Sequence, residues 1–106
     1  MPAWALLCLT IVVEVTATLA LRASDGFTRL APSIVVVAGY GVCFYLLSRV
    51  LRDLPIGFTY AVWSGVGTAL IALVGIVALG EPATALKIAS LGLIVAGVVG
   101  LNLGGH

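Results

Sequence analysis

A single carboxylate interrupts the long apolar run with which the chain begins. Glu14 lies about midway between residue 1 and Arg22, where a membrane-spanning helix would be deepest in hydrocarbon. Burying a charge at that depth costs about 2.5–3.5 kcal/mol on insertion scales, so an acid there is a candidate for function. Such a carboxylate can bind a proton or an organic cation. The alternative is a structural glutamate that only holds helices together by hydrogen bonds.

The residues that share a helical face with Glu14 predict a small polar notch in an apolar surface. Side chains three, four and seven positions apart on a helix lie on the same face. Thr10 and Thr18 can hydrogen-bond, and Ala17 leaves room beside the carboxylate. We therefore expect the site around Glu14 to be lined by the following members of this face: Leu7, Ile11, Ala17 and Thr18.

Aromatic side chains fall on single faces of two further apolar segments. Tyr40 and Phe44 are four residues apart in one segment, and Tyr60, Trp63 and Ser64 share a face of the next. An aromatic ring attracts a cation by about 0.5–2 kcal/mol, most strongly when both are desolvated. Stripes of this kind are often only core packing. Combined with a carboxylate at similar depth, they predict a binding site for a lipophilic cation.

The composition excludes most soluble classes. Charged residues make up 8% of the chain and hydrophobic residues 62%, with a mean hydropathy of +1.29. A soluble domain carries about 25% charged residues, so membrane residence is the physical alternative. A net charge of +1 without a basic cluster argues against nucleic-acid binding. Without a phosphate loop, a Ser/His/Asp set or a metal-ligand cluster, we expect no enzyme, metal or cofactor, and Cys8 and Cys43 only as packing residues.

Four apolar segments predict four transmembrane helices, over residues 3–21, 32–48, 56–79 and 85–103. Each approaches the ~20 residues that cross a bilayer core. The first residues lack the basic region of a signal peptide, so we expect the first helix to be retained. The sequence therefore predicts an all-α membrane protein in which residues 1–106 form one four-helix transmembrane domain.

The loop charges show no orientation bias. Arg22, Arg29 and Lys87 lie on one side of the predicted membrane, and Arg49 and Arg52 lie on the other. The positive-inside rule needs a clear excess on one side, so the chain can insert both ways round. Four helices are also too thin a bundle to enclose a substrate path alone. We therefore expect an antiparallel, dual-topology homodimer, the alternative being a single orientation.

Small residues mark a candidate hinge and a candidate dimer contact. Gly65 and Gly67 lie near the middle of the third segment, where a glycine pair can bend a helix, or equally can allow close helix packing. The fourth segment has small residues at helical spacing, which favour close helix contact in lipid. The expected dimer stripe comprises Ser90, Leu93, Gly97 and Leu101.

The chain resembles the small multidrug resistance family over essentially its whole length, and three stretches carry the resemblance. They are EVTATLALRASDGFTRLAPS from Glu14, LPIGFTYAVWSGVG from Leu54, and GLNL near the end. The resemblance implies a dual-topology dimer in the bacterial-type inner (plasma) membrane that exchanges protons for cationic compounds, with both ligands competing for the two glutamates at the Glu14 position. It also implies substrate contacts at four further residues: Tyr40, Tyr60, Trp63 and Ser64. Glycine is usual in the family at the position of Ser90, which departs from that pattern while remaining small.

The family pattern also bears on the substrate. Guanidinium exporters typically carry Trp, Thr and Lys at the positions of Ala17, Ser64 and Asn102. The residues present here are similar to the quaternary-ammonium and multidrug branch. The resemblance thus implies proton-coupled export of lipophilic cations by a homodimer. The alternatives are a guanidinium exporter and one subunit of a paired heterodimeric transporter.

Two functional classes other than transport are alternatives for a chain of this kind. A rotor subunit of an ATP synthase also holds one membrane carboxylate, but such a subunit is a hairpin of two helices, whereas this sequence predicts four. A non-transporting partner of another membrane protein would give no flux when the purified chain is placed alone in liposomes. We therefore expect the partners of this chain to be a second copy, protons, hydrophobic organic cations and the lipid bilayer.

Overall fold

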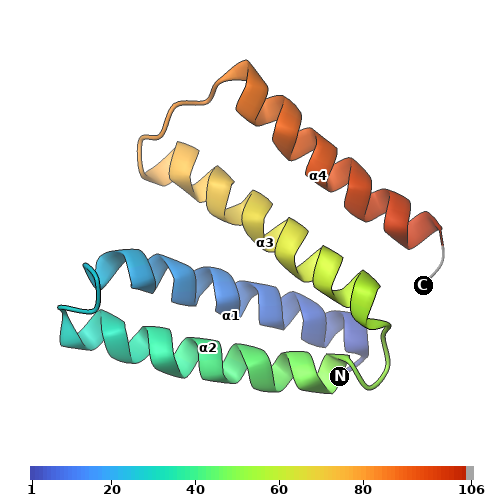
Figure 1. Ribbon diagram of the computed structural model, residues 1–106, viewed down its shortest axis with the longest axis horizontal. Coiled ribbons are helices and arrows are strands. Elements are labelled where there is room, and N and C mark those ends of the chain that lie inside the picture. The colour runs from blue at the N-terminus through green and yellow to red at the C-terminus, as the bar shows by residue number, and fades with distance from the viewer. Residues whose placement is uncertain (105–106) are drawn as a thin grey trace. The chain divides into compact units, whose positions relative to one another are not determined.

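The structure is a computed structural model that describes residues 1–104, and it consists of α-helices joined by short turns (Figure 1). The described residues form four helices: α1 (Ala3–Ala23), α2 (Leu30–Val50), α3 (Ile56–Ala78) and α4 (Ala85–Leu103). The all-α expectation is confirmed. Two helices are longer than predicted, because α1 continues to residue 23 and α2 runs from residue 30 to residue 50. Both therefore include an arginine in the last turn, where a cation complements the helix dipole.

Proline and threonine mark where the helices begin. Pro2 and Pro55 precede α1 and α3 in extended conformation, and Pro32 lies in the first turn of α2. A missing N–H group costs no helical hydrogen bond at these places. Thr84 caps α4, since its hydroxyl accepts a hydrogen bond of 3.2 Å from the backbone N–H of Lys87.

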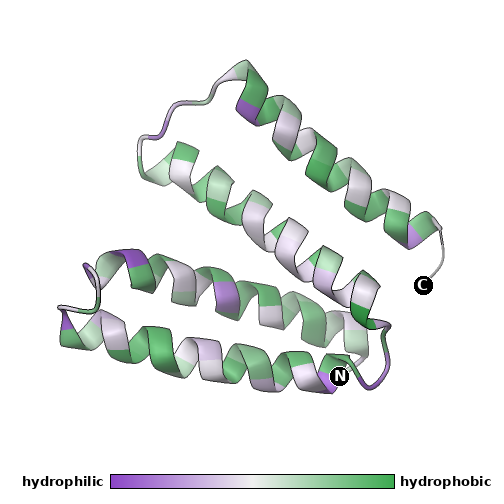
Figure 2. Cartoon of the chain, in the orientation of Figure 1, coloured by the Kyte–Doolittle hydropathy of each residue, from purple (hydrophilic) through white to green (hydrophobic). Residues whose placement is uncertain are grey.

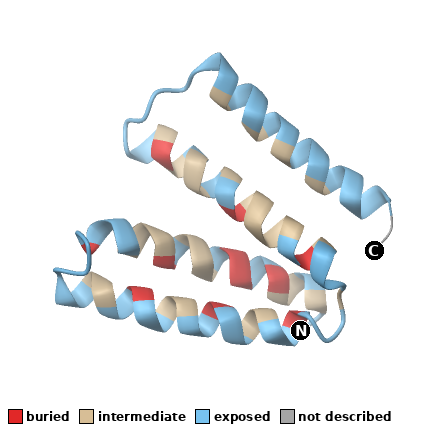
Figure 3. Ribbon diagram, in the orientation of Figure 1, coloured by how far each residue is buried: buried red, intermediate tan, exposed pale blue. Residues whose placement is uncertain are grey.

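All four helices are long and apolar enough to span a membrane. At 1.5 Å per residue they are about 28–35 Å long, against a hydrocarbon core of about 30 Å. Hydrophobic residues run along each helix and hydrophilic residues gather at the turns (Figure 2). Most side chains are exposed on the single chain (Figure 3). Such an apolar surface is stable against lipid or another copy, and not against water.

The chain divides into two compact helical hairpins. Unit 1 comprises residues 1–54, with α1 packed along α2, and unit 2 begins at Pro55 and contains α3 and α4. The sequence predicted one domain over residues 1–106. Each hairpin has its own helix–helix contact, so the contacts within each hairpin are described separately below.

The turn between α1 and α2 has an unusual backbone. Residues 25–27 are all left-handed, with φ values of 50°, 69° and 65°. Phe27 is neither glycine nor asparagine, so its conformation is strained. Ser24 is buried and organises the turn: its hydroxyl accepts from the N–H of Phe27 at 3.1 Å, and its carbonyl accepts from those of Thr28 and Arg29. This turn fixes how α2 returns along α1.

The turn between α3 and α4 is closed by polar contacts. Gly80 has a φ of +72°, and the N–H of Glu81 donates to the carbonyl of Gly75 at 3.0 Å. The Glu81 carboxylate lies against the Cα of Gly75, where a methyl group would collide with it. Lys87 Nζ donates to the carbonyl of Pro82 at 2.9 Å and lies 4.0 Å from Glu81. These contacts hold the end of α3 to the start of α4.

Candidate functional site

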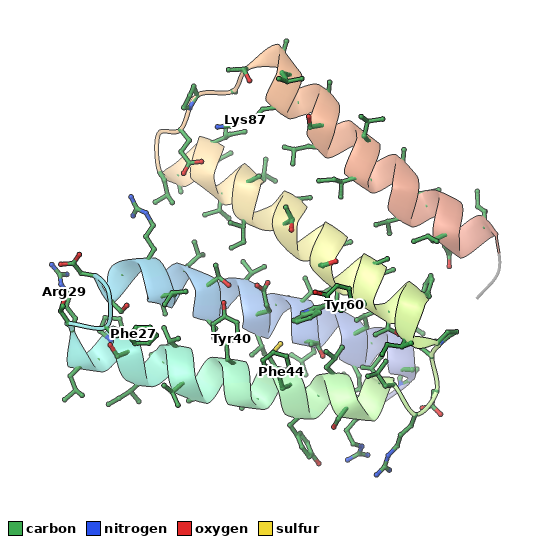
Figure 4. All side chains as sticks on the ribbon, viewed as in Figure 1. Phe27, Arg29, Tyr40, Phe44, Tyr60 and Lys87 are labelled. Carbon is green, nitrogen blue, oxygen red and sulfur yellow. The ribbon has the colours of Figure 1, made fainter. Side chains whose placement is uncertain are left out.

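A hydrogen-bond chain links α1 to α2 at the level of the membrane carboxylate. Thr18 Oγ1 donates to Glu14 Oε1 at 2.9 Å, one helical turn away on α1. The same Thr18 oxygen lies 2.6 Å from the hydroxyl of Tyr40, which projects from α2 toward α1 (Figure 4). All three side chains are half-buried. The structure thus brings together three of the residues that the sequence singled out.

The direction of this chain follows from counting protons. A threonine hydroxyl carries one hydrogen, and here that hydrogen is directed to Glu14. Thr18 must therefore accept the proton of Tyr40 across their 2.6 Å contact. Tyr40 thus donates to Thr18 and Thr18 donates to the carboxylate, so the two hydrogen bonds run in one direction and strengthen each other through mutual polarisation.

The remaining members of the Glu14 face are apolar or satisfied within their own helix. Leu7 and Ile11 are buried. Thr10 is also buried, but its hydroxyl donates to the carbonyl of Leu6 at 2.7 Å, as threonines in apolar helices often do. The polar notch around Glu14 is therefore built by Thr18 and Tyr40.

Ala17 is placed in the contact between the two helices of unit 1. It is 1% exposed, and a Cβ built on Gly39 would lie 2.8 Å from the Ala17 Cβ. Its predicted contact with substrate stays a prediction, because the methyl group faces α2. The sequence analysis did not single out Gly39. The available signal was its position between Val36 and Cys43, which are buried on the same face of α2.

The aromatic residues of unit 2 form a cluster of their own. The rings of Tyr60 and Trp63 pack edge to face, with centroids 5.6 Å apart and planes at 73°. Ser64 donates to the carbonyl of Tyr60 at 2.7 Å, so its hydroxyl is held against the helix. Tyr60 is exposed, as is Phe44 on α2 (Figure 4). The substrate contacts predicted for these residues are not tested by their positions within each hairpin.

The candidate hinge lies in an unbroken helix. α3 continues as an α-helix through Gly65 and Gly67. Gly67 is buried, and a Cβ on Gly65 would lie 3.3–3.4 Å from methyl groups of Val98 and Ile94 on α4. The observed role of Gly65 is close packing against α4, while bending at this pair remains a prediction.

The predicted dimer stripe of α4 is exposed among the described residues 1–104. The predicted dimer residues are all exposed: Ser90, Leu93, Gly97 and Leu101. Within residues 1–104, nothing approaches within 4 Å of a Cβ built on Gly97. This surface is thus open to a second copy, whose presence stays a prediction.

Comparison with known proteins identifies relatives that are similar in sequence to this chain. Residues 2–94 match the family model described as "Small Multidrug Resistance protein". The chain is 50% identical over 103 residues to the quaternary ammonium compound-resistance protein QacE of Escherichia coli, covering 97% of this chain and 94% of the relative. It is 49% identical over 100 residues to the corresponding protein QacF of Klebsiella aerogenes, covering 94% and 91%. A guanidinium exporter of Citrobacter freundii is 45% identical over 103 residues, covering 97% and 98%.

Proposed function

The chain belongs to the small multidrug resistance family, and on that premise we propose that it exports lipophilic quaternary ammonium cations in exchange for protons. It is a multi-pass transporter of the bacterial inner membrane and not an enzyme. Cation efflux is the part of the function that the family and its resistance and exporter proteins support directly. Proton exchange, the substrate class and the residues involved form the proposal.

The observation that carries the proposal is the hydrogen-bond chain from Tyr40 through Thr18 to Glu14. Two aligned donors make an ionised carboxylate tolerable inside an apolar protein. The other acidic residues of the chain lie in the turns, so Glu14 is the acid that a cation within the membrane would meet. A cation bound there would be attracted by the charge, and a proton at the same oxygen atoms would remove that attraction.

Competition for one carboxylate is sufficient to couple the two fluxes. When Glu14 is ionised it binds the organic cation, and when it is protonated the cation is released. A proton entering from the outside therefore displaces a cation that entered from the cytoplasm or the inner leaflet. By linkage, the proton weakens cation binding by the same factor as the cation weakens proton binding.

The aromatic pair of unit 2 favours a cation without N–H donors. A quaternary ammonium cannot hydrogen-bond, so its recognition depends on charge and on contact with aromatic faces. The edge-to-face pair of Tyr60 and Trp63 offers such faces, and Tyr40, Phe44 and Ser64 complete the proposed substrate contacts.

We further propose that the transporter is an antiparallel homodimer. The near-equal distribution of arginine and lysine on the two sets of turns permits insertion in both orientations. The exposed stripe on α4 supplies a contact of small and apolar residues, which is the composition that allows close packing in lipid. Two opposed copies would contribute two Glu14 carboxylates to one transport pathway.

The test is proton-driven uptake of tetraphenylphosphonium into proteoliposomes that contain only this chain. We expect the wild type to take up the cation in exchange for protons that leave the vesicles down a pH gradient. Glu14→Gln should lose this coupled uptake. Asp53→Asn, which neutralises an exposed carboxylate in a turn, is the matched control and should behave as wild type. Coupled uptake by Glu14→Gln would remove the proposed mechanism. A wild type without flux would contradict transport by a homodimer and would agree with a paired transporter or with a non-transporting partner protein.

Guanidinium export is the second candidate, because the guanidinium exporter is nearly as similar to this chain as the quaternary ammonium resistance proteins are. The same proteoliposomes distinguish the two functions. Coupled flux of tetraphenylphosphonium without flux of guanidinium is the result we expect. Coupled flux of guanidinium alone would replace the proposed substrate class.

A further inference from the structure

A close approach between α1 and α2 lies beside the hydrogen-bond chain. A Cβ built on Gly39 would lie 2.8 Å from the Cβ of Ala17 and 3.6 Å from its Cα. Carbon atoms in contact are normally separated by about 3.5–4.0 Å, so the two helices are already as close as a glycine permits. The Ala17 methyl is part of a rigid backbone position, and it cannot turn away to admit a second methyl group.

This contact involves the immediate neighbours of both hydroxyl groups in the chain. Gly39 precedes Tyr40 on α2, and Ala17 precedes Thr18 on α1. The close approach of Gly39 to Ala17 and the 2.6 Å contact between the Tyr40 and Thr18 oxygens therefore depend on the same local spacing of the two helices. A change in that spacing moves the two oxygen atoms apart by a similar amount.

We infer that Gly39 is a positioning residue for the transport site, because its missing side chain sets the helix spacing at which Tyr40 reaches Thr18 and Thr18 supports Glu14. A methyl group at position 39 requires the backbones to separate by about 0.7–1.2 Å to reach normal contact. Added in full to the present 2.6 Å, that displacement brings the two oxygens to about 3.3–3.8 Å, which is at or beyond the limit of a hydrogen bond. Gly39 need not touch the substrate, since it acts through Tyr40.

The inference rests on the proposed role of Glu14 and deepens it. When the donor chain is lost, the ionised carboxylate becomes less stable relative to its protonated form. A proton then competes more strongly for Glu14, so a cation that binds the ionised form binds more weakly. The loss corresponds to one hydrogen bond in a chain that ends on a charge, which is roughly a five- to tenfold change in affinity.

The experiment measures the affinity of the purified protein for tetraphenylphosphonium in lipid nanodiscs, at a pH where the wild type binds fully. Gly39→Ala should bind about five- to tenfold more weakly. The matched control is Gly41→Ala, two positions along the same helix, where no described atom beyond its chain neighbours and its own helix backbone lies within 4 Å of the added Cβ. That control should keep the wild-type affinity.

The double variant Ala17→Gly/Gly39→Ala provides the rescue. With the Ala17 methyl removed, the nearest atom to the added Cβ is the Cα of residue 17 at 3.6 Å, an ordinary contact. The helices then return to their spacing, so the double variant should recover wild-type affinity. If Gly39→Ala fails to fold, this double variant still decides the matter, because weak binding by the folded double variant would overturn the inference.

A cycle with Tyr40→Phe separates positioning from a general loss of stability. If Gly39 acts through the Tyr40 hydroxyl, Gly39→Ala should weaken binding in the wild type but not in the Tyr40→Phe background. An equal loss in both backgrounds would overturn the inference, as would a Gly39→Ala variant that binds like Gly41→Ala. Failure of the proposed function gives a different result, namely a wild type that binds tetraphenylphosphonium without releasing protons.

Discussion

Replacing Thr18 with valine tests the central step of the proposed mechanism. Valine has nearly the same shape, but it removes the hydroxyl that donates to Glu14 Oε1 at 2.9 Å and accepts from Tyr40 at 2.6 Å. A hydrogen bond to a charged group contributes about 1.5–3 kcal/mol. Thr18→Val should therefore weaken tetraphenylphosphonium binding by roughly 10- to 100-fold, at tenfold for each 1.4 kcal/mol.

Two matched variants make this measurement specific. Thr18→Ser keeps the hydroxyl and should stay within about threefold of the wild type, since a serine on a helix has the same donor and acceptor capacity. Thr16→Val makes the identical change on an exposed threonine of α1, whose hydroxyl donates only to the carbonyl of Val12 at 2.9 Å. It should leave binding unchanged.

Isothermal titration calorimetry in micelles, repeated in two buffers with different heats of ionisation, gives both the affinity and the number of protons released. In the wild type, each bound cation should release protons from Glu14. Wild-type affinity in Thr18→Val would refute the reasoning, because it would mean that the hydrogen-bond chain does not support the binding form of the carboxylate. Equal weakening in Thr18→Val and Thr18→Ser would attribute the effect to packing instead.

Three further predictions concern assembly and folding. Adding two lysines to the turn at residues 51–54 should force one orientation of the chain and reduce coupled uptake. Thiol labelling from each side of the membrane verifies the orientation. Full activity with a single verified orientation would argue against an antiparallel pair. Gly97→Leu should block dimerisation without disturbing the hairpin, because the glycine is exposed on α4, whereas Val95→Leu on another face should dimerise normally in cross-linking experiments. Gly75→Ala should leave the thermal unfolding midpoint unchanged or raise it by a few degrees, because the Glu81 carboxylate that the methyl meets is the exposed end of a flexible side chain and alanine favours the helix; a large drop in the midpoint would contradict this.

The helices and their faces could be predicted from the sequence because each depends on local patterns. Apolar length located all four spans, and Pro32 and Pro55 lie where two of the helices begin. Spacing along one helix also placed Thr18 beside Glu14. The ends of α1 and α2 were predicted less accurately. The apolar pattern stops before the arginines at residues 22 and 49, but each helix continues past its arginine.

Contacts between helices could not be predicted in the same way. The sequence showed that Thr10 and Thr18 flank Glu14, but not that the hydroxyl of Thr10 is used by its own helix while that of Thr18 reaches Tyr40. That choice depends on where α2 crosses α1. The crossing in turn depends on Gly39, which has no side chain and therefore contributes no signal to an analysis based on apolar or polar spacing.

The serine-centred turn between α1 and α2 has a consequence for how the chain enters a bilayer. If the chain inserts in both orientations, as we propose, half of the copies must carry this loop through the hydrocarbon. Backbone amides that are already bonded need not be stripped of water on the way, and Ser24 accepts from three of them. Crossing would then cost mainly the transfer of the charged side chains of Arg22, Asp25 and Arg29, so a loop whose backbone amides are bonded within the protein would favour entry in both directions.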